Sequence, residues 1–513
     1  MKQIRLISGL FTVGFWTLAS RVLGFLREVL LTAFIGPGPV MDAFVAAFRL
    51  PNMFRRFFAE GAFNAAFVPM FSKRLEGEED AEGFAQDAFN LLNAAVLALI
   101  GLAMIFMPAL VWITAEGFYG DERFDLAVSY GYVVFPYILF MSLAALFSGV
   151  LNATGRFAAA AAAPVLLNIF ACAAMVAGAL SGGEVVMWLI WVIPLAGVAQ
   201  LALVWVATER AGIRIRPGLP RLTPEMRRMF RVAVPAALAM GVTQVNLVVG
   251  QLVASKTEKA VSWLFAADRL YQLPLGVVGI AVGIVLLPDL SRRLRAGDDD
   301  GARNALSRAG EFSLLLTIPS TVALMVAPLP LVSVLFERGQ FGPDDSAATA
   351  LAVAIYGIGL PSFMLQKLLQ PLFFAREDTK SPFRYAVVAM VVNAGLAFGL
   401  YPLVGWIAPA IATSVAGWVM VGLLVLGSRR MGEVARFDAR FHARAWRIVA
   451  ASAIMGAALF AIVQMFGWAF EVPSWRYLAL LGLVVCAGLV YFIAAQMLGA
   501  FRISELRGAL RRS

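Results

Sequence analysis

Apolar residues fill this chain in windows of about 20, and polar or Pro/Gly-rich turns separate the windows. A helix of that length, rising about 1.5 Å per residue, crosses the hydrocarbon core of a bilayer. The pattern predicts fourteen membrane-spanning helices, near residues 8–34, 41–71, 86–113, 126–152, 157–181, 185–208, 229–254, 259–290, 309–336, 346–374, 383–403, 406–427, 446–468 and 474–499. The connecting stretches are too short for a soluble domain, so any function must be built from helices.

Composition agrees with this pattern. Of 513 residues, 61% are hydrophobic and 14% charged, and the mean hydropathy of +0.82 lies far above that of soluble domains. The net charge of +10 is spread over many short loops rather than gathered on one domain. We therefore predict an all-α polytopic membrane protein and no nucleic-acid partner.

Basic residues orient the predicted spans, because cytoplasmic loops hold an excess of Lys and Arg. With the N-terminus inside, thirty of the 42 basic residues fall in cytoplasmic segments. Five fall in outer segments, namely Arg123, Lys256, Lys259, Arg338 and Arg476. Both termini are thus predicted to be cytoplasmic. The first twenty residues mimic a secretory signal, but the apolar run continues to Ile35, which favours an uncleaved first span.

Four sequence anchors recur at a nearly constant offset and indicate an internal repeat. They are Pro69–Leu75 with Pro288–Leu294, Leu110 with Leu331, Phe157 with Phe383, and Asn168 with Asn393, at offsets of 219, 221, 226 and 225 residues. We predict two six-helix bundles, over 1–215 and 216–435, followed by two extra spans and a basic tail over 436–513. Because six is even, the repeat is parallel, an arrangement in which transporters enclose a central cavity between two bundles.

Seven basic residues remain at predicted membrane depth: Arg21, Arg27, Arg49, Arg55, Arg56, Arg269 and Lys367. Arg21, Arg55 and Arg269 each lie roughly 15–20 Å into their spans and are expected to converge near mid-membrane. An uncompensated Arg there costs about 3 kcal/mol on the lenient insertion scale. We therefore expect these side chains to face a water-filled cavity.

Acidic residues compensate this charge only in part. Helical spacing predicts the pairs Arg21 with Glu28, Asp42 with Arg49, and Arg56 with Glu60, while Asp268 adjoins Arg269. Seven bases against four acids leave a surplus of three positive charges. The surplus predicts an anionic ligand, and guanidinium groups suit phosphate oxygens. The structural alternative is that Arg49 and Lys367 snorkel, that Arg56 only pairs with Glu60, and that Arg21 joins helices.

Two features interrupt the second span: Pro51, followed by Asn52, and Gly61. A proline removes a helix hydrogen bond, and such breaks are tolerated at membrane depth beside a cavity or a neighbouring helix. They predict either a static kink or a bend that lets the cavity open to each side in turn.

Motifs for chemistry are missing from the sequence. No lysine follows a glycine, so no phosphate-binding loop for ATP is encoded, and the only histidine, His442, lies in a basic loop. We predict no catalytic residue, no metal site and no bound cofactor, and hence not an enzyme. Energy is expected from an ion gradient or the membrane potential, with Asn246, Asn393 and Thr413 as candidate cation ligands or, more simply, helix-to-helix hydrogen bonds.

The charged motifs carry a family resemblance. The segments are Ser20–Arg27, Asp42–Phe44, Leu50–Asn52, Arg55–Phe63, Phe67–Pro69, Ala267–Leu270 and Leu287–Pro288. Together they resemble the MurJ (MviN) lipid II flippases of the MOP superfamily, whose fold is similar to that of MATE transporters. The resemblance covers nearly the whole chain and implies movement of lipid II, the undecaprenyl-diphosphate-linked disaccharide-pentapeptide, to the periplasmic leaflet of the bacterial inner membrane.

The resemblance also implies roles for individual residues. Substrate-binding positions are Arg21, Arg27, Arg55 and Arg269; gating or supporting positions are Glu28, Asp42, Pro51, Asn52, Arg56, Glu60, Gly61 and Asp268. Many relatives have Asp where this chain has Glu28, which leaves the partner of that carboxylate open. The last two spans are expected to receive the polyprenyl tail, and membrane lipids and the cell-wall synthesis machinery are expected partners.

Other functions stay open at this point. A flippase for another polyprenyl-linked glycan would use the same chemistry. A cation or drug antiporter of the superfamily would need acidic residues in the cavity. The surplus of positive charge argues against this function. A membrane glycosyltransferase or phosphatase would need a catalytic loop that the short connections do not offer, and a pure scaffold would tolerate loss of Arg269.

Overall fold

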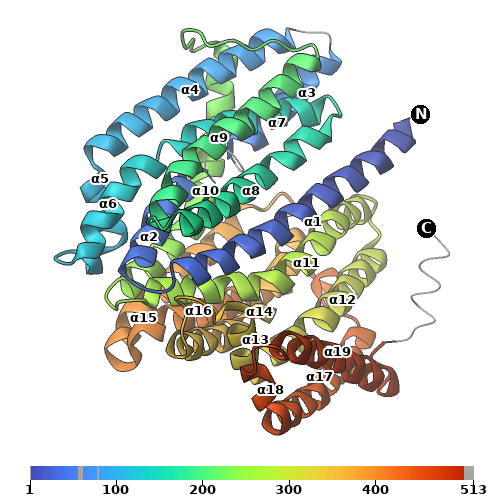
Figure 1. The fold of residues 1–513 in the computed structure, drawn as a ribbon. Helices are drawn as coiled ribbons and strands as arrows, with labels where there is room; N and C mark the ends of the chain where they lie inside the picture. Colours follow the sequence, from blue (N-terminus) through green and yellow to red (C-terminus); the bar gives the residue numbers. More distant parts are fainter. Residues whose placement is uncertain (1, 56–61, 78–79, 502–513) are drawn as a thin grey trace. The chain divides into compact units, whose positions relative to one another are not determined.

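The computed structural model describes residues 2–55, 62–77 and 80–501, and these residues form α-helices and short 3-10 turns without a strand (Figure 1). The prediction of an all-α membrane protein is confirmed. The chain divides into two compact units, Met1–Ser262 and Trp263–Ser513.

Unit 1 contains ten helices in the described residues. They are α1 (Lys2–Phe34), α2 (Pro39–Arg55), α3 (Ala62–Glu76), α4 (Ala81–Ile105), α5 (Met107–Thr114), α6 (Glu122–Val134), α7 (Tyr137–Ala153), α8 (Phe157–Ser181), α9 (Val185–Arg210) and α10 (Pro224–Ala254). Helix α1 packs along α8, α8 packs on α9, and α2 packs on α6. These contacts place the charged helices α1 and α2 against partners of the same unit.

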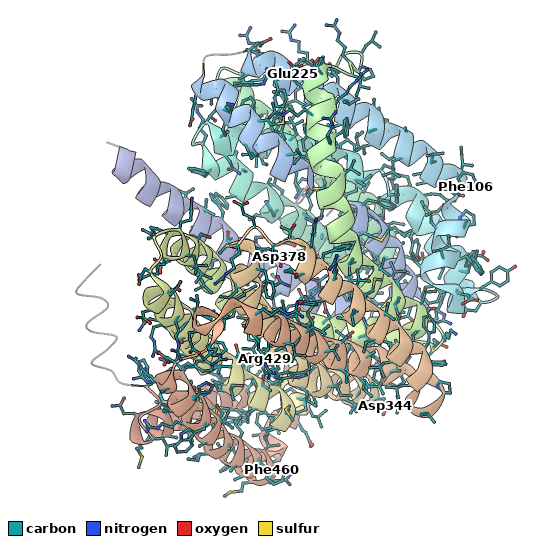
Figure 2. All side chains as sticks on the ribbon, turned by 180° about the vertical axis from the view of Figure 1, so that it is seen from behind. Phe106, Glu225, Asp344, Asp378, Arg429 and Phe460 are labelled. Atoms are coloured by element: carbon teal, nitrogen blue, oxygen red, sulfur yellow. The ribbon has the colours of Figure 1, made fainter. Side chains whose placement is uncertain are left out.

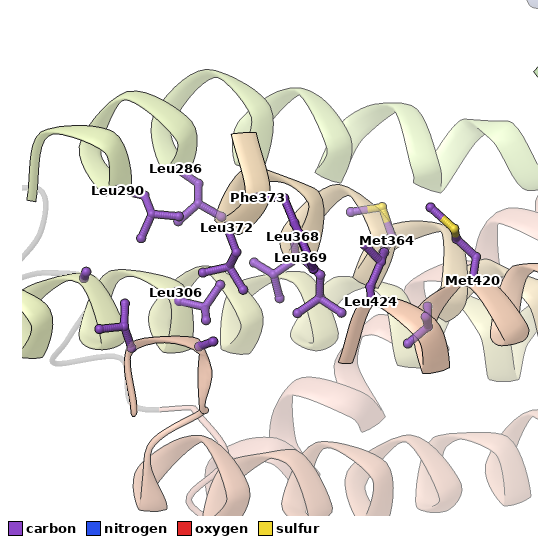
Figure 3. Packing of buried hydrophobic residues seen from close by; sticks show 14 of the residues in the cluster. Leu286, Leu290, Leu306, Met364, Leu368, Leu369, Leu372, Phe373, Met420 and Leu424 are labelled. Carbon is purple, nitrogen blue, oxygen red and sulfur yellow. The ribbon is translucent and has the colours of Figure 1, made fainter. Parts of the chain in front are cut away.

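Unit 2 begins three residues inside α11. Its helices are α11 (Ala260–Arg295), α12 (Asp299–Val326), α13 (Pro328–Phe336), α14 (Pro343–Phe374), α15 (Lys380–Val404), α16 (Ala408–Ser428), α17 (Ala439–Phe466), α18 (Trp468–Glu471) and α19 (Arg476–Met497). Leucine, methionine and phenylalanine side chains from α11, α12, α14 and α16 form one buried cluster (Figure 3). Because α12 also packs on α17, the helices that follow the repeat are joined to the same unit.

Nine helical stretches among the described residues are long and apolar enough to cross a membrane. They cover ten predicted spans, because α15 and α16 lie in one stretch, Lys380–Met431. The four predicted spans outside this set lie near 8–34, 41–71, 229–254 and 259–290, and three of those four carry six of the seven basic residues at predicted membrane depth; the seventh, Lys367, lies in Pro343–Phe374. The count of fourteen stays a prediction.

Helix ends add further matches to the sequence repeat. Asp80 accepts a hydrogen bond from the Gly83 amide before α4, at 2.7 Å, and Asp298 does the same for Gly301 before α12, at 2.9 Å. Such side-chain caps satisfy amides that the first helical turn leaves free. Both helices then break, at Phe106 (labelled in Figure 2) and at its repeat partner 221 residues later, and continue as the short helices α5 and α13.

The segment between α9 and α10 is extended and lies along α4. Glu82, Gln86 and Asn90 recur every fourth residue on α4, and their side-chain oxygens accept the amides of Arg214, Arg216 and Gly218 at 3.0, 2.8 and 2.8 Å. Since α10 also packs on α3, α10 falls in unit 1. The predicted bounds 1–215, 216–435 and 436–513 describe the sequence repeat, which differs from this division by contacts, and they stay a prediction.

Candidate functional site

Arg27 is held in a polar cluster between α1 and α8. Its Nη2 lies 2.6 Å from Glu28 Oε1, and its Nη1 donates to Asn168 Oδ1 at 3.0 Å. Asn168 Nδ2 in turn donates to the carbonyl of Ser20 at 3.0 Å. Helix α1 approaches α8 closely here, because a Cβ built on Gly24 would lie 3.5 Å from Asn168 Nδ2. The amide of Asn168 therefore orients the guanidinium of Arg27.

Burial differs between the members of this cluster. The side chain of Glu28 is 6% exposed and that of Arg27 is 17% exposed. A buried carboxylate needs a counter-charge, which Arg27 supplies, while the guanidinium keeps part of its surface accessible. Arg27 can thus contact a ligand without leaving Glu28.

The predicted pair of Arg21 with Glu28 is wrong. Arg21 is exposed on α1 and forms no ion pair with a described residue, whereas Glu28 pairs with Arg27. The physical reason is packing: α1 lies on α8, and Asn168 and Arg27 together surround the carboxylate that helical spacing alone assigned to Arg21. Arg21 therefore retains its positive charge without a described acidic partner.

Asp42 lies at the start of α2, and its side chain is fully buried. Its carboxylate accepts the amides of Lys259 and Ser262 at 2.8 and 2.9 Å, and also the Ser262 hydroxyl. Arg123 Nη1 lies 3.6 Å from Asp42 Oδ2. Lys259 has a φ of 67°, a left-handed conformation costly for a residue with a Cβ, and its bond to Asp42 holds that turn.

The predicted pair of Asp42 with Arg49 is also wrong. Asp42 is occupied by Arg123 and the α10–α11 turn, and Arg49 donates to the carbonyl of Leu247 on α10 at 3.2 Å. Partners from other helices satisfy the buried carboxylate better than the residue seven positions along α2. Asp42 is therefore no counter-charge for Arg49.

Arg123 itself is buried and well held. Its Nε lies 2.9 Å from Asp121 Oδ2, its Nη2 donates to the carbonyl of Gly117 at 3.3 Å, and its Cζ lies 4.6 Å above the ring of Phe118. With Asp121 and Asp42 as counter-charges, this guanidinium is neutralised within the chain. Its surroundings indicate a structural role.

Pro51 lies inside α2, and the helix continues to Arg55. Asn52 Nδ2 donates to the carbonyl of Phe48 at 2.8 Å, so the side chain after the proline bonds back to the preceding turn. Such back-bonding often accompanies local bending of a helix. The predicted role of Pro51 in opening a cavity stays a prediction.

The remaining predicted residues fall at other places. Arg55 is half-buried at the end of α2, and Arg56, Glu60 and Gly61 lie outside the described residues. In unit 2, Arg269 lies on α11 with its Cζ 4.6 Å above the ring of Phe265. Asp268 accepts a hydrogen bond from Gln272. That Arg21, Arg27, Arg55 and Arg269 share one chamber stays a prediction.

Sequence reasoning assigned no role to Asn168, Arg123 or Ser262. The repeat carried a signal for two of them, because Asn168 recurs as Asn393 and Ser262 lies 220 residues after Asp42, within the range of repeat offsets. Arg123 had only its place in an outer loop. Among the described residues, no group of three or more His, Cys, Asp and Glu side chains is suited to a metal ion.

Long apolar helices with arginines at predicted membrane depth are typical of a multi-pass membrane transporter. Solved structures agree: an inward closed conformation of the lipid II flippase MurJ has a TM-score of 0.79 at 24% identity, covering 94% of this chain and 98% of that one. An inward-facing MATE family multidrug resistance transporter of the MOP superfamily has a TM-score of 0.62 at 14% identity, covering 83% and 94%. These likenesses show the fold.

Sequence comparisons show the family to which the chain belongs. The family model described as lipid II flippase MurJ matches residues 31–486. Probable lipid II flippases MurJ of Rhizobium tropici and Rhizobium meliloti are 43% and 45% identical, each over 99% of this chain and over 97% and 96% of their own lengths. The lipid II flippase MurJ of Burkholderia cenocepacia is 36% identical, covering 84% of this chain and 85% of its own. The chain belongs to the MurJ family of lipid II flippases, which are transporters rather than enzymes.

Proposed function

We propose that this chain moves lipid II from the cytoplasmic to the periplasmic leaflet of the bacterial inner membrane by alternating access. Membership of the MurJ family and the MOP-type fold support the substrate and the transport cycle. The loop distribution of Lys and Arg supports cytoplasmic termini. The lipid is then delivered where cell-wall synthesis enzymes consume it.

The observation that carries the proposal is the uneven charge on α1. Glu28 is paired with Arg27. Arg21 lies six residues before Arg27 on the same helix and has no described acidic partner. Asp42, counted from sequence as compensation for Arg49, is occupied by Arg123. Positive charge at membrane depth is stable when an anion or water meets it. A diphosphate supplies such an anion, and Arg21, Arg27, Arg55 and Arg269 are its proposed ligands.

The same surplus separates this function from its nearest alternative. A cation or drug antiporter needs carboxylates free to bind a cation, whereas Glu28 and Asp42 both face arginines. A flippase for another polyprenyl-linked glycan would bind the same diphosphate. Those two substrates are therefore distinguished by the transported lipid itself.

Energy for the cycle is proposed to come from the membrane potential or a coupled ion. An empty cationic cavity returning toward a negative interior gains about 2.3 kcal/mol per charge per 100 mV. The potential should thus assist the resetting step. Dissipating it with an ionophore is expected to slow turnover, and an unchanged rate would refute this coupling.

Depletion in the native bacterium tests the function as a whole. Lipid II is measured on each leaflet after the chain is depleted and again after it is restored. We expect outer-leaflet lipid II to fall while the inner pool rises, and restoration to reverse both. Normal outer-leaflet exposure, or accumulation of a different polyprenyl-linked glycan instead, would contradict the assignment to lipid II.

A further inference from the structure

Two arginines of unit 2 gather at the carbonyl end of α13. Arg338 Nη2 donates to the carbonyls of Val334 and Leu335, at 2.7 Å each. Arg476, the first residue of α19, donates from Nη1 to the carbonyl of Glu337 at 3.0 Å. The partial negative charge of a helix C-terminus favours one cation there. A second guanidinium at the same end adds charge that the helix does not balance.

Neither guanidinium has a carboxylate partner among the described residues. The nearby carboxylate of Glu337 accepts instead from the hydroxyl of Ser346, at 2.7 Å. The Nε atoms of Arg338 and Arg476 are buried without a hydrogen-bond partner. A buried donor left unsatisfied is costly, so the chain itself does not meet the full hydrogen-bonding capacity of either guanidinium.

The two side chains share one aromatic ring. The Cζ atoms of Arg476 and Arg338 lie 5.1 and 5.8 Å from the ring centroid of Tyr477, and Arg476 Nη2 donates to the Tyr477 hydroxyl at 3.1 Å. Burial and the neighbouring Arg476 charge lower the pKa of Arg338 from its usual value. Like charges held this close are expected to attract an anion.

The corresponding place in unit 1 is neutralised by the chain itself. Gly117 lies 221 residues before Arg338, and its carbonyl likewise accepts a guanidinium, that of Arg123. There the carboxylates of Asp121 and Asp42 balance the charge. In each repeat an arginine from a different sequence position donates to a carbonyl just after the short helix, and among the described residues only the first repeat places carboxylates beside it.

The surroundings of Arg338 and Arg476 indicate a membrane interface. Trp468, Trp475 and Tyr477 are exposed around the start of α19, and the large exposed side chains that follow along α19 as far as Ile493 are apolar. Aromatic belts of this kind lie at the level of lipid headgroups. The predicted topology places this end on the outer side of the membrane.

We propose that Arg338 and Arg476 form a site for the phosphate of an anionic glycerophospholipid of the outer leaflet. The guanidinium forks bind the phosphodiester oxygens, and the acyl chains lie along the apolar face of α19. The two arginines are separate from those proposed to bind the diphosphate of lipid II, so the lipid held here is a resident ligand that shares only α19 with the spans expected to receive the polyprenyl tail.

The test uses the full-length purified chain and measures lipid binding by native mass spectrometry. We expect the wild-type chain to bind phosphatidylglycerol more tightly than phosphatidylcholine, and Arg338→Gln or Arg476→Gln to weaken phosphatidylglycerol binding by about tenfold. Lys256→Gln removes an exposed positive charge from another loop of the same predicted membrane side and should leave binding unchanged. Equal binding of both lipids, or binding that the Gln variants leave intact, would overturn the proposal.

Two further arms identify the ligand and guard against misfolding. Arg476→Lys keeps the charge but loses the fork, and should bind phosphatidylglycerol with an affinity between those of the wild-type chain and Arg476→Gln. If the Gln variants do not elute as folded protein, the proposal is tested by Arg476→Lys and by the lipid preference of the wild-type chain. Millimolar inorganic phosphate should not displace the lipid, and displacement would show a site for free anions instead. Because the readout is lipid binding, failure here leaves the proposed transport function standing.

Discussion

Two arginine–carboxylate clusters of unit 1 use the same chemical groups in opposite ways. The carboxylate of Asp42 is fully buried and receives Arg123, two backbone amides and a hydroxyl. The cluster on α1 leaves Arg27 partly exposed, and Arg21, six residues earlier on the same helix, is exposed. The first cluster consumes its charge internally, and the second presents charge to its surroundings. The comparison teaches that exposure and balance, rather than the mere presence of arginine, separate a structural site from a candidate binding site.

Asp42→Ala tests the structural role of the buried cluster and is expected to have the largest effect on stability. Removing the carboxylate leaves Arg123 with Asp121 as its remaining counter-charge. It also leaves the backbone amides of Lys259 and Ser262 without their acceptor. We expect the free energy of unfolding to fall by about 3–5 kcal/mol, measured by thermal unfolding in detergent. Asp121→Asn, which removes the more exposed partner of Arg123, is the control and should cost no more than about 1 kcal/mol. Equal losses for both variants would show that Asp42 is not the central residue of the cluster.

Arg27→Gln tests the open cluster. The substitution removes the counter-charge of Glu28 and one proposed contact to the diphosphate. Lipid II transport should fall roughly tenfold to hundredfold, corresponding to about 1.4–2.7 kcal/mol, while the protein still elutes as a folded species. Arg27→Lys should recover only part of the rate, because an ammonium lacks the guanidinium fork. Full activity of Arg27→Gln would show that this cluster has a structural role, as the cluster of Asp42 and Arg123 does.

Asn168→Ala tests whether the orientation of Arg27 matters for transport, because Asn168 orients Arg27 without being a proposed substrate ligand. The loss of one neutral hydrogen-bonding side chain is expected to cost about 1 kcal/mol and to reduce transport about fivefold. Arg27→Gln combined with Asn168→Ala should be no slower than Arg27→Gln alone, since both act through one guanidinium. Additive losses in transport would show that Asn168 acts independently of Arg27.

A third cluster, in unit 2, extends the comparison to pH. Asp438 caps α17 through the Phe441 amide at 2.7 Å and pairs with Arg308. Burial opposes ionisation of Asp438, but these hydrogen bonds and Arg308 prevail and lower its pKa below the ordinary 3.8. Its contribution to stability is therefore present above pH 3.8 and lost as the pH falls through the lowered pKa.

Asp438→Asn should accordingly lower the free energy of unfolding by about 1 kcal/mol at neutral pH. The difference from the wild-type chain should shrink as the pH falls below 3.8 and the wild-type carboxylate becomes protonated. Unfolding midpoints measured across this range check the sign. A difference that grows toward acid pH would contradict the assignment of a lowered pKa to Asp438.

Much of the fold follows from the sequence, because burial in a bilayer demands long apolar helices. Ten of the predicted spans overlap helical stretches of the described residues that qualify by length and composition. The set of charged motifs from Ser20–Arg27 to Leu287–Pro288 also led to the correct family. The membrane crossing of the other four predicted spans stays a prediction.

Charge pairing could not be predicted in the same way. Helical spacing compares residues of one helix, and it assigned Asp42 to Arg49 and Glu28 to Arg21. In the structure, partners from remote helices or adjacent in sequence prevail: Asp42 receives Ser262 from 220 residues away, and Glu28 receives its neighbour Arg27 because α8 holds that guanidinium in place. Tertiary packing, which periodicity does not encode, selects among the available partners.

The central claim, that Arg21 and the partly exposed Arg27 of α1 bind lipid II as it crosses the membrane, is tested most directly by translocation in proteoliposomes. Lipid II is placed in one leaflet, and its arrival in the other is followed with an impermeant lipid II-binding probe. We predict protein-dependent arrival with the wild-type chain and strongly reduced arrival with Arg21→Gln and Arg27→Gln, at equal reconstitution. Arrival at the wild-type rate in both variants would contradict the claim.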